Sequence, residues 1–166
     1  MWMNRTELQE TQTPPAMVAS SAQVSERMSR LPRKDTTPEL ALRRLLFASG
    51  LRYRVHERVT GMPRRTVDIS FTRVRVAVFV DGCFWHGCPD HGMTPKANRD
   101  WWSRKLDGNR SRDAETSAHL SALGWVVLRF WSHEEPDAMA ESVKACVLSR
   151  RLALGLKPVR RARGLT

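Results

Sequence analysis

The sequence has few cysteines, a single tyrosine and no long apolar run. With only three cysteines in 166 residues, a framework of disulfides cannot hold the fold, so a reducing compartment is expected. No apolar stretch approaches the roughly 20 residues that span a bilayer. The first residues, MWMNRTELQETQTPPA, lack the apolar core of a secretory signal. We therefore expect an intracellular, cytoplasmic protein without a membrane partner.

Acidic residues are scarce relative to basic ones. The chain has 17 Asp and Glu against 28 Lys and Arg, which gives a net charge of +11 and a pI near 10.9. Such an excess favours a polyanionic partner such as nucleic acid, although many proteins are basic only for solubility. The length fits one domain. Residues 1–24 are polar and aperiodic and predict a flexible arm, residues 25–155 the folded domain, and residues 156–166 a basic tail.

Helical patterns occur at both ends of the folded domain and within it. TTPELALRRLLFASG predicts a helix over 36–50, in which Thr36 and Glu39 form a capping box. A second helix is expected over 99–124, with a break at Gly108. Two further helices are expected. A short one lies in the basic segment 24–34 and stops before Pro32, and a closing one covers 135–155.

Four segments have the patterns of strands. Residues 51–59 alternate, with the apolar side chains up to Val55 facing inward, and TVDISFT alternates with Val67 and Ile69 inward and Asp68 on the other face. VRVAVFVDG is apolar on both faces, as a central strand is, and GWVVLRFW repeats that pattern. The order α-β-β-β-α-β-α predicts an α/β domain with a mixed sheet flanked by helices.

Cysteine and histidine gather at the end of the third strand, in FVDGCFWHGCPDH. Cys83, Cys88 and His91 have the spacing C-x4-C-x2-H, and thiolates with imidazole suit a tetrahedral zinc site. The fourth ligand is either His86, in the same segment, or His133, which follows the last strand. Two buried cysteines and exposed histidines are the alternative without a metal.

Acidic residues are expected at the same end of the sheet. Asp68 and Asp81 bracket the hairpin of the second and third strands, so antiparallel pairing would bring both to one edge. A carboxylate beside main-chain carbonyls suits magnesium, which takes further ligands from water and phosphate. Taken alone, Asp68 fits a surface acid of a strand at least as well, and Asp113 fits an ordinary acid on a helix surface.

Two aromatic residues, Phe84 and Trp85, lie between the candidate metal ligands. Core packing is the ordinary explanation for each, because Phe and Trp are usually buried. Two neighbours at a strand end, however, cannot both point into one core. The pair is therefore a candidate for contact with the partner.

Three segments, FVDGCFWHGCPDH, KLDGNRSRD and GWVVLRFW, resemble the very short patch repair (DNA mismatch) endonuclease family. The resemblance runs from about Glu26 to Leu148, and GCFWH is its most specific part. It implies a restriction-endonuclease-like α/β fold, a nick in one strand beside a T·G mismatch, magnesium for catalysis and a structural zinc. The mismatch would arise by deamination of 5-methylcytosine.

The resemblance assigns roles position by position. Asp68 corresponds to the aspartate that binds magnesium and Val80 to the residue whose main-chain carbonyl shares it. His86 corresponds to the catalytic histidine, and Asp113 to the acid that orients it. The family's zinc ligands correspond to Cys83, Cys88, His91 and His133. The aromatics that insert into the base stack correspond to Phe84 and Trp85, and Met28 corresponds to a residue that inserts from the other side. Glu39 and Asn109 also match positions near the site.

The chain also departs from the family pattern. Val67 stands where a proline usually precedes the metal-binding aspartate, and His133 where cysteine is common. Asp81 occupies a position that is histidine in some relatives. In the wider nuclease superfamily a lysine would stand where this chain has Cys83, so the work of that lysine would have to fall to His86.

Two other functions stay open at this point. One is a related nicking nuclease that acts on modified or invading DNA, because a wedge reads deformability as well as bases. The other is a zinc-stabilised DNA-binding module, which would have no need of Asp68, His86 and Asp113 together. The expected partners are duplex DNA with a T·G mismatch and mismatch-repair proteins, and we expect a monomer associated with the nucleoid.

Overall fold

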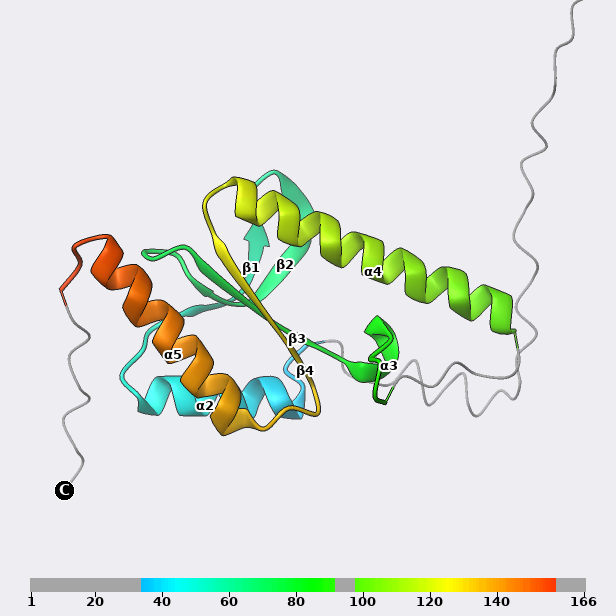
Figure 1. The fold of residues 1–166 in the computed structure, drawn as a ribbon, viewed down its shortest axis with the longest axis horizontal. Helices are drawn as coiled ribbons and strands as arrows, with labels where there is room; N and C mark the ends of the chain where they lie inside the picture. Colours follow the sequence, from blue (N-terminus) through cyan, green and yellow to red (C-terminus); the bar gives the residue numbers. More distant parts are fainter. Residues whose placement is uncertain (1–33, 92–97, 158–166) are drawn as a thin grey trace, which may run out of the picture.

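The computed structural model describes residues 34–91 and 98–157. Its elements are α2 (Thr37–Ala48), β1 (Arg54–Val59), β2 (Met62–Phe71), β3 (Val76–Asp81), α3 (Cys83–His86), α4 (Arg99–Ala122), β4 (Val126–Trp131) and α5 (Pro136–Ala153) (Figure 1). The predicted arm, Met28, the short helix predicted within 24–34 and most of the tail predicted over 156–166 lie outside the described residues.

The four strands form one mixed sheet in the order β1-β2-β3-β4. β1 and β3 each pair antiparallel with β2, whereas β3 and β4 run parallel and are joined through α3 and α4. Helices α2 and α5 lie on one face of the sheet and α4 on the other (Figure 1). The predicted α/β architecture is thus confirmed. None of the helices in the described ranges is long and apolar enough to cross a membrane.

The core has two parts, one on each face of the sheet. The larger part joins the sheet to α2 and α5 and includes Leu42, Leu46, Ile69, Val78, Met139 and Val143. The smaller part lies on the α4 side and contains Val59, Val67, Ala77, Phe79 and Leu120. Strand β3 contributes to both and is buried along its whole length, as its two-sided apolar pattern predicted. It therefore fixes the position of the segment that follows it.

Strand β2 changes face at Asp68. Val67 packs in the α4 side of the core but Ile69 in the α2 and α5 side, so the predicted alternation is wrong at this step. In the neighbouring strand, His56 has a left-handed φ of 51°, a conformation that departs from strand geometry. Val55, expected to face inward, is 43% exposed. Irregular backbone thus surrounds the candidate metal-binding aspartate.

Two helix predictions also need correction. Helix α4 runs through Gly108 without a break, because one exposed glycine costs a helix only about 1 kcal/mol, too little to interrupt 24 residues. At the start of α2 no reciprocal capping box forms. Glu39 instead accepts the Thr36 hydroxyl at Oε1 and the Asp35 N–H at Oε2, both at 3.0 Å. The carboxylate of Glu39 is thereby fixed at the end of the helix that approaches the sheet.

Candidate active site and metal centre

The two central strands separate at Asp68, and this opening forms the first part of the site. Backbone pairing between β2 and β3 ends at Ile69 and Val78. Beyond that pair the Asp68 side chain replaces a backbone partner, because its Oδ2 accepts the Val80 N–H at 2.9 Å. The N–H and C=O of one strand residue point to the same side, so the Val80 carbonyl also faces β2. A carboxylate and a carbonyl oxygen therefore converge at the strand ends.

The charge of Asp68 is costly to hold in the protein alone. Burial raises the pKa of Asp68 from its ordinary value to about 6, against the opposing effect of the Val80 N–H. The negative charges of Glu39 and Asp81 raise this pKa further. A bound cation would stabilise the ionised carboxylate in such surroundings. The electrostatics thus favour a cation at Asp68.

Glu39 belongs to a charged cluster that the sequence did not reveal. Its side chain is almost fully buried and accepts a hydrogen bond from Arg43 Nη2 at 3.0 Å. Arg43 also pairs with Asp35, whose Oδ1 lies 3.0 Å from His56 Nε2. The ligand atoms of the two acids and the histidine lie within 4.8 Å of one another. The Arg43 guanidinium pairs with both acids, so the cluster holds the Glu39 carboxylate in place near Asp68.

The structure brings His86 and Asp113 together from α3 and α4. His86 Nδ1 lies 2.5 Å from Asp113 Oδ2 and 3.7 Å from Asp81 Oδ1. Arg129, on β4, pairs with both acids. The four side chains line a recess of about 280 Å³. His86 Nε2 has no hydrogen-bond partner in the described part of the chain, so it is free to act on a bound molecule.

Opposing effects set the protonation of this histidine and its partner. Burial lowers the pKa of His86, but the hydrogen bond to Asp113 and the charge of Asp81 outweigh it and raise the pKa overall. For Asp113, burial raises the pKa, yet His86 and Arg129 together hold it below the ordinary value. Asp113 is therefore ionised at neutral pH. An ionised carboxylate on Nδ1 fixes the imidazole with Nε2 as its reactive nitrogen.

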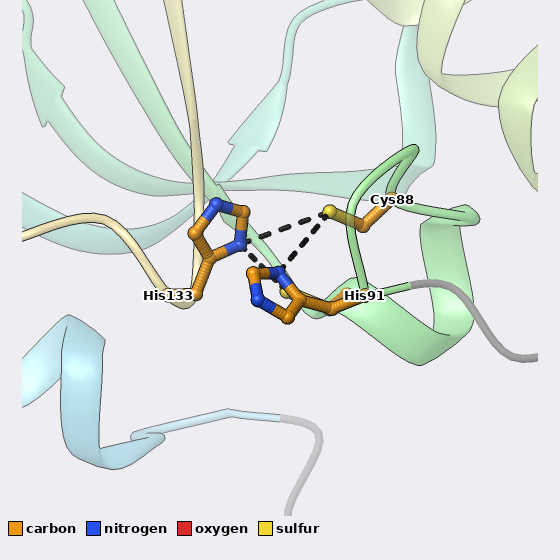
Figure 2. A group of neighbouring side chains, drawn as sticks. Cys88, His91 and His133 are labelled. Atoms are coloured by element: carbon orange, nitrogen blue, oxygen red, sulfur yellow. Dashed lines mark hydrogen bonds between the residues drawn. The ribbon is translucent and has the colours of Figure 1, made fainter.

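Cys83, Cys88, His91 and His133 form a second, separate cluster, and their ligand atoms all lie within 4.8 Å of one another. Figure 2 shows three of them turned toward one another, Cys88 and His91 from the loop after α3 and His133 from the segment after β4. The Sγ–Nδ1 distances are 3.1 Å for Cys83 and His133, 3.7 Å for Cys88 and His133, and 3.9 Å for Cys88 and His91. Zinc bond lengths imply an S–N edge of about 3.6 Å in a tetrahedron. The residues therefore fit a zinc ion.

The same geometry favours His133 over His86 for the fourth position. His86 stands outside the thiol cluster and is engaged by Asp113, whereas His133 lies within it. The chain turns at Gly87, which ends α3 with a left-handed φ of 64°. Arg110 binds the carbonyls of His86 and Gly87 at 3.4 and 2.9 Å, so closely that a Cβ at Gly87 would collide with it. This turn separates His86 from Cys88 and His91, which follow it.

Phe84 and Trp85 lie in an aromatic cluster on the surface rather than in either core part. Their rings are 5.1 Å apart, and Trp102, from the start of α4, lies 5.2 Å from Phe84 and 6.2 Å from Trp85. Both residues are half-buried. Asn109 Nδ2 donates to the Trp85 carbonyl at 2.7 Å and so fixes this segment to α4. The cluster is thus held in place while its rings stay partly accessible.

Sequence reasoning missed Arg129 and Trp102 at this site. Arg129 is the single charge in the apolar strand GWVVLRFW, and a lone charge in such a strand is a signal of a buried partner. Trp102 stands in the aromatic pair of RDWWSR, among charged residues at the start of a helix. Both signals were present but depended on knowing which elements are neighbours.

The chain is similar to known DNA endonucleases and nicking enzymes. The family model described as DNA mismatch endonuclease Vsr matches residues 17–91. The type II nicking enzyme V.NaeI from Lentzea aerocolonigenes is 48% identical over 122 residues, 72% of this chain and 74% of the relative. The type II nicking enzyme V.NmeDIP from Neisseria meningitidis serogroup C is 41% identical over 124 residues, 71% and 81% of the two chains.

A relative named for mismatch cleavage is more distant. The DNA mismatch endonuclease Vsr of Escherichia coli strain K12 is 34% identical over 117 residues, 70% of this chain and 73% of the relative. The matched family region contains Asp68, His86 and the three loop ligands of the thiol cluster. The fold joins Asp113 and His133 to them from outside that region. The chain belongs to the very short patch repair (Vsr) family of DNA endonucleases.

Proposed function

We propose that this endonuclease nicks one strand of duplex DNA beside a T·G mismatch, by magnesium-dependent hydrolysis, and so initiates very short patch repair. The observation that carries the proposal is the convergence at one end of the sheet of Asp68 with the Val80 backbone and of His86 with Asp113. Nicking and mismatch cleavage are the activities named for the relatives. The same proposal includes action as a monomer and later recruitment of mismatch-repair proteins.

The residues of the site divide the chemistry between them. Asp68 and the Val80 carbonyl would hold magnesium, which when bound neutralises charge on the phosphate and on the leaving oxygen. His86 Nε2 accepts the proton of the attacking water, and Asp113 on Nδ1 keeps the ring in the required orientation. Because His86 accepts the proton, this chain does not need the lysine that the wider nuclease superfamily has at the position of Cys83.

The thiol cluster supports this machinery without taking part in it. Cys83, Cys88, His91 and His133 would hold zinc with all four positions filled by protein, which is the pattern of structural rather than catalytic zinc. Zinc there would tie the loop that carries His86 to the segment after β4. The ion would therefore contribute to stability and to the placement of His86.

The aromatic cluster supplies a means of finding a mismatch. A planar side chain pushed into the base stack costs a few kcal/mol of unstacking, and a poorly stacked wobble pair costs least. Phe84 and Trp85 are accessible, rigidly placed and next to His86 in the chain. Insertion of this pair would therefore select T·G over paired DNA and bring the neighbouring phosphate to the site. Met28, proposed to insert from the other side, lies outside the described residues.

A related target is the second candidate, a nicking nuclease for modified or invading DNA. It is favoured by the names of the more similar relatives, which are type II nicking enzymes. One experiment separates the two. Duplexes that differ only by T·G, T·A or C·G at one position, in several flanking contexts, are labelled on each strand in turn and incubated with magnesium or with EDTA. We expect a magnesium-dependent nick of the thymine strand of T·G alone. Equal cleavage of paired duplexes would contradict mismatch specificity but retain the nuclease.

A further inference from the structure

Arg129 lies on β4, and its guanidinium is bound by Asp81, Asp113 and Ser117. Nε and Nη2 donate to the two carboxylate oxygens of Asp81, each at 2.7 Å, the forked arrangement in which arginine binds a carboxylate most strongly. Nη1 donates to the Asp113 main-chain carbonyl at 3.4 Å and to Ser117 Oγ at 3.3 Å. Nη2 also lies 3.2 Å from Asp113 Oδ1. Four of the five N–H groups of a guanidinium thereby donate hydrogen bonds within the site, and Nη2 is also ion-paired with Asp113, so little of Arg129 is left for a substrate phosphate.

One face of the guanidinium also packs against the core. It packs over the ring of Phe79, with 4.7 Å between Cζ and the ring centroid, and Phe79 is itself part of the core on the α4 side. The Arg129 side chain is only 24% exposed. An arginine with a fixed plane and an acceptor for each of its three nitrogens has one orientation, unlike a solvated surface arginine.

This fixed position resolves a competition at His86. Nδ1 carries a single N–H, and two carboxylates lie near it, Asp113 at 2.5 Å and Asp81 at 3.7 Å. Asp81 Oδ1, the oxygen nearer to His86, is also the oxygen that Arg129 Nη2 binds. Without the fork of Arg129, two repelling carboxylates would contend for one N–H, and the ring would lose its single orientation.

We propose that Arg129 is a positioning residue of the nuclease site. It holds Asp81 away from His86, fixes the backbone and carboxylate of Asp113, and so leaves Asp113 as the only partner of Nδ1. It acts through these acids and does not touch the DNA. The inference rests on the proposed role of His86 as the general base. It makes the aspartate at position 81 and the arginine at 129 one functional unit.

Two variants separate this role from that of an ordinary scaffold ion pair. Arg129→Gln removes the charge and the fork, while Arg129→Lys keeps the charge but cannot bind both oxygens of Asp81 in one plane. Because one of the two tasks of Arg129 is to hold Asp81 away from His86, removing the charge of Asp81 should relieve part of the need for Arg129. Asp81→Asn added to Arg129→Gln should therefore recover activity. If the pair served only to stabilise the fold, the second substitution would lower activity further.

The test uses single-turnover nicking of a T·G duplex at saturating enzyme, together with the Kd for the same duplex without magnesium. Expected for Arg129→Gln is a rate lower by about 10–100-fold, the usual effect of removing the partner of an active-site ligand, with Kd unchanged. Arg129→Lys should be slowed as well. The double variant Arg129→Gln with Asp81→Asn should nick faster than Arg129→Gln alone. Arg65→Gln, which breaks a surface ion pair with Glu115 of α4, is the matched control and should keep the full rate.

Three results would overturn the inference. One is a full rate in Arg129→Gln, and another is a weaker Kd that accounts for its loss of activity. The third is a double variant that is slower than Arg129→Gln, with all variants shown to be folded by circular dichroism. Failure of the unaltered protein to nick any duplex would overturn the proposed function itself, and is thereby distinguished from a failure of the role given to Arg129.

Discussion

The segment of residues 82–91 supplies two clusters of opposite character. In the thiol cluster every ligand atom faces the others, so a tetrahedral ion would find all its positions filled by protein. In the acid–histidine cluster His86 Nδ1 is bound by Asp113, and His86 lines a recess of about 280 Å³. The first cluster is closed and the second is open.

The difference shows that the partner of a histidine, more than its place in the chain, determines its chemistry. His133 Nδ1 lies 3.1 Å from a thiol, an arrangement that suits a metal ligand. His86 Nδ1 lies 2.5 Å from a carboxylate, an arrangement that suits proton transfer at the other nitrogen. The left-handed turn at Gly87 keeps the two arrangements apart. A closed cluster should therefore govern stability, and an open one should govern rate.

A large change in rate is expected from Asp68→Asn, which alters the proposed magnesium site and leaves the thiol cluster intact. Loss of the carboxylate should lower nicking by roughly 10³-fold, because a metal ion contributes several kcal/mol to such a reaction. The pKa of Asp68 is raised in the fold, so its contribution to stability falls as pH rises from 3.8 through about 6. At pH values above that window Asp68→Asn should raise the melting temperature.

These two readouts are measured by single-turnover nicking and by calorimetry on the same preparation. Asp107→Asn, which removes an exposed acid of α4, is the control and should change neither. If Asp68→Asn nicked at the unaltered rate, Asp68 would have no role in catalysis.

The largest change in stability is expected from Cys88→Ala, which opens the closed cluster. Loss of a structural metal is among the few single changes that cost more than about 4 kcal/mol. For a chain of this size that lowers the melting temperature by roughly 8–16 °C. Zinc content should fall with it, as measured by atomic absorption. Cys146→Ala, on α5 outside the cluster, should keep its zinc. Full zinc content in Cys88→Ala would contradict the ligand set.

A moderate effect is expected from pH, through the open site. A base acts only when deprotonated, and the pKa of His86 is raised above its ordinary value. The nicking rate should therefore increase by up to tenfold per unit as pH rises, and level off once the pH exceeds the raised pKa of His86. Asp68, with a pKa of about 6 in the protein alone, must also ionise to bind magnesium. More magnesium should shift that part of the profile to lower pH and leave the His86 part in place. A rate that falls across this range would contradict a histidine base.

The smallest effect is expected from Trp85→Ala and Phe84→Ala. Each should lower the preference for T·G over paired DNA by roughly tenfold, about 1.4 kcal/mol, while non-specific binding by Lys and Arg is retained. The readout is competition binding with mismatched and paired duplexes. Trp101→Ala, which removes a ring that contacts Trp102, is the matched control. If binding to mismatched and paired duplexes weakened equally, Phe84 and Trp85 would have only a structural role.

Much of the fold followed from local patterns. The alternation of the strands, the two-sided apolar pattern of β3 and the stop at Gly50 predicted the order of elements that the structure has. The expected antiparallel pairing of β2 and β3 also placed Asp68 at the end of β3, where its carboxylate accepts the Val80 N–H. These features depend on neighbours in the chain, which a sequence displays directly.

Features that depend on distant neighbours could not be read in this way. Spacing left His86 and His133 as equal candidates, because Cys83 and His133 meet across 50 residues. Asp113 is 27 residues from His86 and was assigned only by resemblance. Arg129 was not assigned at all, because its two acids belong to β3 and α4.

Local rules also failed where the backbone is irregular. The exposure of Val55 and the change of face after Val67 accompany the left-handed conformation of His56. The short helix α3 was not expected, because a four-residue helix has no periodicity of its own. Both irregularities border the site. The sequence rules are therefore least reliable next to the residues that carry the chemistry.

The separation of the two histidines is tested most directly by zinc content and nicking rate in His86→Ala and His133→Ala, measured on the same preparations. We expect His86→Ala to keep its zinc and its melting temperature while nicking falls by roughly 10²–10⁴-fold, as for the loss of a general base. His133→Ala should lose zinc and stability. The opposite result, His86→Ala without zinc and His133→Ala with it, would show that His86 is a ligand and would contradict its role as the base.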